Sequence, residues 1–442
     1  MMCLHSAGNE QFKEAVLSEL SELRALDSLR AKLLIVCRAT QRVGVFLLTL
    51  TLSFELVAQP LIELPKSGLE PHQLAVIYLR DDVRSKAIAD YYRKARAIPK
   101  ENVFAVAFDS SKKQIEPGHF AVQFAALSAK LDENVQAFAL AWDQPYQVGC
   151  MSLSAAFAFG YNVDYCADSC KKTRISSYFH TLSATPWDDF GMRPTMMLAA
   201  GDLEQNVRLI ERGKLADASL TRGKVILLDT SDRRRSVRSR FFSEIERDFQ
   251  QVSDVYRFNS DSVSGLENIL LYVAGTKRVE DLDTIGFMPG ALADHLTSAG
   301  GKLTDSRQMS AVEWLRAGAT ASYGTAIEPC NLTEKFPNPV IQLWHYLRGT
   351  TALEAYWKSV RMPGQGNFIG EPLAAPYRGY KLKRVPNGWE IHSPVIFQGR
   401  YKIFSGELGA ERYVETRTVS KYKPLITLHE PLSTSYRIER IY

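Results

Sequence analysis

The sequence predicts an α/β protein with a mostly parallel, doubly wound sheet, helices on both faces, and a small β-rich segment at the C-terminus. The first observation is a β-α-β unit, in which apolar runs at 74–79 (LAVIYL) and 103–108 (VFAVAF) flank a helical stretch at 85–97. Continuous apolar strands of this kind are typical of parallel sheets covered on both faces. Second, strands and helices continue to alternate along the chain. Third, strand-like alternation replaces helical periodicity after Gly379.

Each expected element carries a local signal. In the first helix, Ser85 is the expected cap, Ile88, Tyr91 and Tyr92 form an apolar stripe, and Pro99 follows the end of the helix. The stretch 144–194 shows no clear period and is expected to be irregular. The remaining expected strands lie at 135–140, 195–200, 225–228, 269–273, 285–288 and 319–323, and the remaining expected helices at 115–131, 204–215 and 312–316.

Composition excludes several classes of protein. The chain has 442 residues, of which 45% are hydrophobic and 23% charged, so it is neither wholly disordered, nor collagen-like, nor a polytopic membrane protein. Its formal net charge of +5 is too small to argue for nucleic acid as a partner. Neither standard glycine-rich phosphate loop is present. The length suits two to three domains of about 150 residues each.

An export signal is predicted near the N-terminus. The apolar run 43–57 (VGVFLLTLTLSFELV) follows Lys32, Arg38 and Arg42, and Ala58 precedes a polar stretch that contains Pro60. A basic region, a short apolar region and a small residue before the cleavage point form the pattern of a secretory signal. An uncleaved anchor and a buried core segment are the alternatives. We therefore expect a leader and signal peptide at 1–58, an α/β subdomain at 59–215, a second at 216–378 and a β-rich extension at 379–442.

Four cysteines remain after the predicted cleavage. They are Cys150, Cys166, Cys170 and Cys330, and in an exported chain they can form two disulfides with three possible connectivities. Asp164 and Asp168 alternate with Cys166 and Cys170, and carboxylates and thiolates can ligate zinc. Because this spacing is not a standard zinc pattern, we predict disulfides, with free thiols and a metal site as the alternatives, and we assign no metal or cofactor.

Acidic and aromatic residues follow several predicted strands. Ligand clefts of open α/β sheets lie at the carboxyl ends of the strands. An aspartate after a strand also commonly caps the next helix, so both interpretations stay open. A basic run at 233–240 (RRRSVRSR) can bind phosphate, acidic polysaccharide or a membrane surface, or form a solvated helix start. The candidate binding residues are Asp82, Trp142, Asp143, Tyr146, Asp229 and Glu328.

Several motifs resemble an uncharacterised family of exported bacterial proteins. They are the segments 85–93 (SKAIADYYR), 96–103 (RAIPKENV), 318–324 (GATASYG, followed by Glu328-Pro329) and 370–373 (GEPL). Members of this family occur in species that carry an exosortase-type sorting system. The resemblance implies a periplasmic or extracellular protein and does not imply a particular reaction, because the family has no established activity.

A more distant resemblance is to gingipain-type cysteine peptidases, which have a caspase-like α/β fold. The matching segments are 318–325 (GATASYGT), 349–355 (GTTALEA) and 370–373, where Glu371 replaces the usual Asp. These peptidases hold a histidine after one strand and a cysteine after the next. The corresponding turns here, at 273–276 and 288–290, contain neither residue, so we do not expect peptidase activity by that mechanism.

Weak catalytic candidates remain near these turns. Asp294, His295 and Ser298 have the residue types of a hydrolytic triad, and Cys330 is a further candidate. On a helix, Asp294 and Ser298 share a face while His295 points about 100° away. The alternative interpretation is a polar helix end followed by a tight turn at Gly300 and Gly301.

The sequence leads to two main hypotheses on function. The first is an exported, non-peptidase relative of caspase-like peptidases that binds envelope proteins or polysaccharide-assembly components. Under this hypothesis we expect neither a nucleic-acid partner nor a stable transmembrane span after signal cleavage. The second is a hydrolase, a peptidase or esterase, with Ser298 and His295 as first candidates. A structural envelope protein without a cleft of useful size is a third possibility.

Overall fold

The computed structural model describes residues 59–442, apart from 168–169, 408, 422, 430–432 and 442. Residues 59–442 form one compact unit. The predicted leader and export signal at 1–58 lie outside the described residues.

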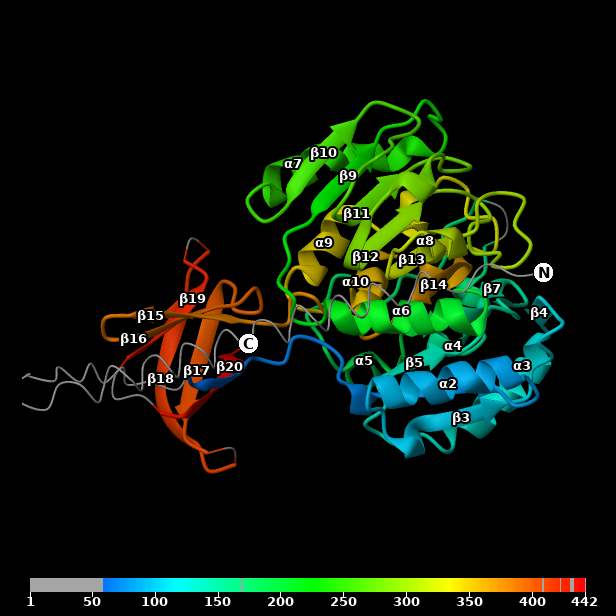
Figure 1. Cartoon of the computed structure of the whole chain (residues 1–442). Helices are drawn as coiled ribbons and strands as arrows, with labels where there is room; N and C mark the ends of the chain where they lie inside the picture. The colour runs from blue at the N-terminus through cyan, green and yellow to red at the C-terminus, as the bar shows by residue number, and fades with distance from the viewer. Residues whose placement is uncertain (1–58, 168–169, 408, 422, 430–432, 442) are drawn as a thin grey trace, which may run out of the picture. The chain divides into compact units, whose positions relative to one another are not determined.

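Ten of the described strands form one sheet (Figure 1). Nine of these strands fall into two sets in which every pairing is parallel. One set consists of β9, β10, β11, β12 and β13, and the other of β2, β3, β5 and β8. α-Helices lie between most of the strands that follow one another in the chain, which confirms the α/β class predicted from the alternation. From one edge to the other the strands are β10 (Asp254–Phe258), β9 (Lys224–Leu228), β11 (Ile269–Ala274), β12 (Phe287–His295), β13 (Ala321–Thr325), β14 (Gly366–Gly370), β8 (Thr195–Met197), β5 (Ala137–Leu140), β2 (Leu74–Leu79) and β3 (Val103–Val106).

The strand β14 lies between the two parallel sets. It pairs antiparallel with β13 over its whole length and meets β8 where Ile369 lies opposite Met197. All five residues of β14 are buried. The two sets therefore form one continuous sheet through this strand.

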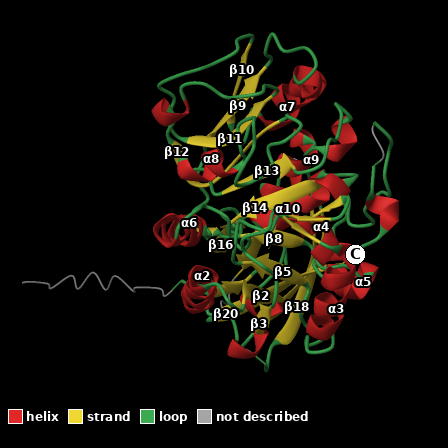
Figure 2. Cartoon of the chain, turned by 90° about the vertical axis from the view of Figure 1, so that its right-hand side faces the viewer, coloured by secondary structure: helices red, strands yellow, loops and turns green. Residues whose placement is uncertain are grey.

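Helices cover both faces of the sheet, as Figure 1 and Figure 2 show: α2 and α6 lie on one face, and α3 and α4 on the other. Their bounds are α2 (Val83–Ala95), α3 (Pro117–Ser128), α4 (Leu153–Phe159) and α6 (Leu203–Ala216). The other α-helices are α5 (Pro186–Phe190), α7 (Phe242–Phe249), α8 (Val312–Arg316), α9 (Pro339–Tyr346) and α10 (Ala352–Ser359). Short strands β4 (Gln114–Ile115), β6 (Gln147–Val148) and β7 (Met151–Ser152) form a small separate sheet.

The cap of the first helix differs from the sequence prediction. Asp82, not Ser85, caps α2, and its carboxylate accepts a hydrogen bond from the Ser85 backbone N–H at 3.0 Å. The buried Ser85 hydroxyl instead accepts from the Leu79 backbone N–H at 2.8 Å. Both residue types are good caps, and only the packing of the helix against β2 decides between them.

The prediction for the region around Asp294 is wrong. A short strand at 285–288 and a helix through 294–298 were expected, but β12 runs from Phe287 to His295. Its second half pairs with β11, with Asp294 opposite Val273 and His295 opposite Ala274. In a sequence, two polar residues at the end of a strand predict side chains exposed to solvent. Here both side chains are buried. The stretch 144–194 also contains α4 and α5 and is less irregular than expected.

The C-terminal segment is a β-module. Its strands form two sheets that share one buried core, which includes Ile391 and Ile426 from one sheet and Tyr401 and Ile438 from the other. The strand β1 (Leu61–Glu63) joins this module by pairing with β20 in parallel. The module strands are β15 (Lys381–Val385), β16 (Gly388–His392), β17 (Gly399–Ser405), β18 (Arg412–Val419), β19 (Leu425–His429) and β20 (Ser435–Ile441).

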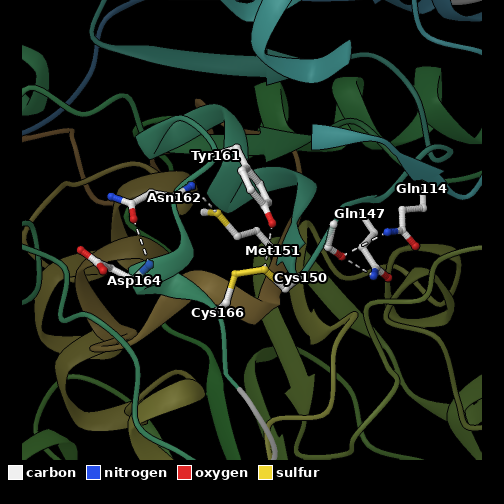
Figure 3. The surroundings of a disulfide bond; sticks show 9 residues. Gln114, Gln147, Cys150, Met151, Tyr161, Asn162, Asp164 and Cys166 are labelled. Atoms are coloured by element: carbon white, nitrogen blue, oxygen red, sulfur yellow. Dashed lines mark hydrogen bonds between the residues drawn. A yellow bond between two sulfur atoms is a disulfide. The ribbon is translucent and has the colours of Figure 1, made fainter. Parts of the chain in front are cut away.

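The four cysteines at 150, 166, 170 and 330 form two disulfides, which confirms the predicted bridges. Cys150 pairs with Cys166, and Cys170 pairs with Cys330 across 160 residues of sequence. Figure 3 shows the Tyr161 hydroxyl directed at Cys150, whose sulfur lies 3.2 Å away. Both bridges tie the chain that follows α4 to other parts of the fold, because Cys166 is joined to Cys150, before α4, and Cys170 to Cys330, after β13.

Loop length predicts that the two bridges differ in their contribution to stability. In the chain-entropy model, closing a loop of about 160 residues contributes about 5 kcal/mol, and a loop of about 16 residues about 3 kcal/mol. The C170S/C330S variant should therefore lower the free energy of unfolding more than C150S/C166S does, as measured by urea denaturation. Equal losses, or a larger loss for the short bridge, would contradict this ranking.

A buried carboxylate at the end of β14 anchors α2. Glu371 accepts hydrogen bonds from Arg96 Nη2 at 2.5 Å, Arg96 Nε at 2.9 Å and the Tyr92 hydroxyl at 2.7 Å. Arg96 also contacts Asp217, which follows α6. Glu371 is fully buried, so these partners replace the water that would otherwise stabilise its negative charge. The GEPL motif thus has a structural role here.

Removing this charge should be strongly destabilising. E371Q leaves the buried Arg96 with Asp217 as its remaining carboxylate partner, and breaking a buried ion pair costs about 3–5 kcal/mol. Urea denaturation measures the loss. The matched control is E204Q, because Glu204 pairs with Arg208 on the exposed face of α6 and should matter little. A loss for E371Q no greater than for E204Q would show that the Glu371 network is dispensable.

Candidate functional site

Loops that follow the carboxyl ends of strands in both sets meet beside the start of β14, and we call this part of the sheet the carboxyl edge. Asn367, on β14, donates hydrogen bonds from its side chain to the Tyr146 carbonyl at 2.8 Å and to the Gly301 carbonyl at 3.0 Å. Tyr146 follows β5 of one set and Gly301 follows β12 of the other. Thr304 and Gln144 are also hydrogen-bonded, at 2.5 Å. This is the edge at which open α/β sheets bind ligands.

A polar cleft of about 350 Å³ lies at this edge. Most of it is formed by the loop between β12 and α8, with one contribution from the loop after β5. Its charged residues are of both signs, so the cleft has no single-sign field. The lining residues are Asp143, Arg278, Leu303, Thr304, Asp305, Ser306, Gln308, Met309, Ser310, Val312, Glu313 and Arg316.

Asp143 is held in place by its neighbours. Its carboxylate forms an ion pair with Arg84 of α2 at 2.7 Å, and its side chain is 12% exposed. The preceding Trp142 is buried, and its indole N–H donates to the Pro145 carbonyl at 3.0 Å. Of the six predicted binding residues, Asp143 is the one that lines the cleft.

Tyr146 reaches the cleft through Asp305. The tyrosine hydroxyl contacts the Asp305 carboxylate, which also pairs with Lys113 at 2.6 Å. Burial alone would raise the pKa of Asp305, but the hydrogen bonds from Lys113 and Tyr146 outweigh it and lower the pKa below its usual value. Asp305 therefore presents a fixed negative charge to the cleft at neutral pH.

The structure does not bring Asp294, His295 and Ser298 together as a triad. Asp294 and His295 are consecutive residues of β12, so their side chains point to opposite faces of the sheet. His295 Nδ1 accepts from the Trp314 indole N–H at 2.9 Å, and Asp294 pairs with Arg238 at 2.5 Å. Ser298 is half-buried beyond the strand, and no histidine is hydrogen-bonded to it in the part of the chain described.

Arg238 changes the interpretation of the basic run 233–240. A solvated helix start was expected, yet Arg238 is 2% exposed and donates to the Ala274 and Pro337 carbonyls at 3.0 and 3.2 Å. Burial raises the pKa of its partner Asp294, while the charge of Arg238 opposes that shift. The pair ties the 236–241 turn to β12, which is a structural role.

The loop after β12 carries contacts that the sequence analysis missed. The Thr297 hydroxyl donates to Gln308 Oε1 at 2.7 Å and accepts from Arg235 Nε at 3.3 Å. The same Gln308 oxygen accepts from the Ala299 backbone N–H at 2.8 Å. Gln308 thus braces one wall of the cleft. In the sequence, the polar composition of residues 304–310, between a predicted strand and a predicted helix, was the feature that could have indicated this wall of the cleft.

The other predicted site residues lie elsewhere. Asp82 caps α2, and Asp229 bonds Ser236 at 3.0 Å and Arg257 at 3.0 Å. Glu328 accepts from the Cys330 backbone N–H at 2.8 Å. Cys330 is in a disulfide and therefore offers no thiolate nucleophile in this state.

The described residues contain no group of three or more histidine, cysteine, aspartate or glutamate side chains placed to hold a metal ion. They also contain no helix with the length and apolar character needed to cross a bilayer.

Comparisons with known proteins do not assign the chain to a family. Neither a scan against protein-family models nor a search of curated proteins finds a match. A solved structure described as "Structure of Protease" aligns with 84% of this chain and 95% of its own, at 11% identity and a TM-score of 0.39. Similarity at this level assigns no activity.

The burial of His295 predicts a pH dependence of stability. Burial, followed by the charge of Arg238, lowers the pKa of His295 from 6.5 to about 3. The unfolded chain therefore takes up a proton that the native chain does not, so this contribution to stability is complete above about pH 6.5 and is lost as the pH falls. Between about pH 6 and pH 4, H295Q should reduce the slope of unfolding free energy against pH by about 1.4 kcal/mol per pH unit. An unchanged slope would show that His295 is not buried in its neutral form.

Proposed function

We propose that this chain is an exported envelope protein that acts by binding, without peptidase activity, and that its carboxyl-edge cleft receives a polar segment of a partner protein. The observation that carries the proposal is the cleft itself, with fixed carboxylates, exposed arginines and hydroxyl groups at the shared edge of the two strand sets. Such a lining can hydrogen-bond and ion-pair with an extended polar peptide.

The absence of a nucleophile–base pair in the described hydrogen bonds supports binding over catalysis. Among the described residues, the histidine side chains that form hydrogen bonds do so with Trp314, Glu390 or another histidine, and not with a serine, threonine or cysteine side chain. A serine or cysteine nucleophile needs such a partner within about 2.6–3.2 Å. The two disulfides are consistent with an oxidising compartment outside the cytoplasm.

We also propose the caspase-like, gingipain-type relationship that the motifs imply, in an exosortase-associated setting. In support, the three motif segments contact one another. Segment 318–325 contains β13, which pairs with β14, and the Ala352 and Leu353 N–H groups of α10 donate to the Ala374 and Pro372 carbonyls at 2.9 and 3.2 Å. The relationship suits a role in envelope protein sorting or exopolysaccharide-associated assembly.

A hydrolase remains the second candidate, on one observation. Ser298 follows the carboxyl end of a central strand, is half-buried, and makes no hydrogen bond within the described part of the chain. Such a hydroxyl can react only if a base approaches when substrate binds. The test below therefore includes Ser298.

The binding proposal is tested with a proteome-derived peptide library. Immobilised protein, residues 59–442, is incubated with the library, bound peptides are identified by mass spectrometry, and the Kd of the best binder is measured by calorimetry. T304W places a large ring at the exposed rim of the cleft and should weaken binding at least about tenfold, or about 1.4 kcal/mol. S128W, on the exposed surface of α3, is the matched control and should bind as the wild type does.

The same incubation distinguishes the alternatives. No binder, or equal affinity for T304W and S128W, would rule out the cleft as the binding site. New peptide termini that appear with wild type and disappear with S298A would establish a hydrolase. New termini that persist with S298A would contradict the non-peptidase proposal and place the active residues elsewhere.

A further inference from the structure

The net charge of the chain is concentrated in the C-terminal β-module. Residues 379–442 contain eleven of the 54 basic residues but only six of the 49 acidic ones. The segment therefore carries +5, and the remaining 378 residues, with 43 of each sign, carry none. A net positive charge of this size on about 60 residues attracts anionic partners.

Exposed cations lie on the outward sides of both sheets of the module. In β15, Lys381 and Lys383 are exposed and alternate with Leu382, which packs against the core. In β17, Arg400 and Lys402 are exposed and alternate with the buried Tyr401 and Ile403. Because the two sheets share one core, the two sets of cations lie on opposite outer sides of the module. None of the four forms an ion pair with a side chain in the described ranges.

A groove of about 370 Å³ runs beside β18 and β19. The side chains that line it are cationic, hydroxyl-bearing or aliphatic, and the described lining includes no carboxylate and no benzene-type or indole ring. Arg417 pairs through Nε with Glu415 at 2.8 Å, and Lys423 is exposed. The lining residues are Arg417, Thr418, Ser420, Lys423, Leu425, Ile426, Thr427 and His429.

We propose that the β-module binds an acidic polysaccharide and that the groove beside β18 and β19 binds one segment of the polymer. Carboxylates of uronate units complement Arg417, Lys423 and the exposed strand cations, and the threonine and serine hydroxyls suit sugar hydroxyls. The glycan is an occupant distinct from the peptide of the carboxyl-edge cleft, so this proposal goes beyond the function argued above.

The placement of the cations favours a polymer over other anions. A flat lipid surface can meet only one outward side of the module at a time, whereas a flexible chain can follow the groove and contact both sides. Single-stranded nucleic acid is bound largely by stacking of bases on aromatic side chains. The groove lining described offers a single imidazole, that of His429, and no benzene-type or indole ring, so a carboxylate-bearing glycan is the better match.

The test uses polygalacturonate as the probe and residues 59–442 as the protein. Binding to immobilised polygalacturonate is measured by biolayer interferometry, with neutral dextran and phosphatidylglycerol vesicles as separate arms. Affinity for polygalacturonate should fall about tenfold or more between about 50 and 200 mM NaCl, because screening weakens exposed charge contacts. Binding to dextran should be absent.

Matched double variants locate the surface. K402Q/K423Q removes two cations from the module and should weaken polygalacturonate binding about fivefold or more, whereas K112Q/K130Q removes two exposed cations from the α/β sheet portion and should change it less than about twofold. Circular dichroism confirms that both remain folded. Equal effects of the two variants, no binding at low salt, or binding to vesicles but not to polygalacturonate would each overturn the proposal. T304W should leave polygalacturonate binding unchanged. A failure of the glycan proposal can therefore be told apart from a failure of the cleft proposal.

Discussion

The strand β14 is the constraint on which the rest of the structure depends. It is the antiparallel partner of β13 and links two sets of parallel strands that would otherwise be separate sheets. Asn367 at its start ties together the loops after β5 and β12, and Glu371 just past its end ties down α2 through Arg96. The backbone must also turn at Gly370, where φ is +138° and a Cβ would lie 2.5 Å from the Ala321 Cα. The loops that form the cleft are held beside each other by the hydrogen bonds from Asn367 of this strand.

Buried charge at the end of β12 explains why residues of triad type do not form a triad. Asp294 and His295 lie in a central strand, where each must find a partner on its own face of the sheet. Arg238 neutralises the first and Trp314 satisfies one nitrogen of the second. Both side chains therefore stabilise the strand, and the half-buried Ser298 lies beyond the end of the strand. Chemistry at this edge must therefore come from the loops, where the cleft residues lie.

The chain carries two surfaces of different electrostatic character. The carboxyl-edge cleft has fixed charges of both signs, which suits selective recognition of a short polar segment. The β-module carries the entire net charge, which suits a repetitive anionic polymer bound with little sequence selectivity. A protein with both surfaces can hold a partner protein close to an acidic matrix, and the two attachments are independent because no residue lines both sites.

Local sequence patterns determined the class of the fold. Apolar runs of four to six residues and helical stripes predicted the α/β alternation, and the change of period after Gly379 predicted the β-rich end, because both signals arise between near neighbours in the chain. The four cysteines were also sufficient to predict two bridges. Of the predicted site residues, Asp143 lines the cleft because it directly follows a buried strand, a position that sequence alone can recognise.

Only the tertiary structure decided the features that depend on distant partners. The extension of β12 through two polar residues, the burial of Arg238 and the pairing of Cys170 with Cys330 each depend on a segment far away in the sequence. A charged residue looks the same in sequence whether it faces water or a buried counter-charge. Its environment is set by which strands pair across the sheet, and that choice minimises the free energy of the whole chain rather than of any short window.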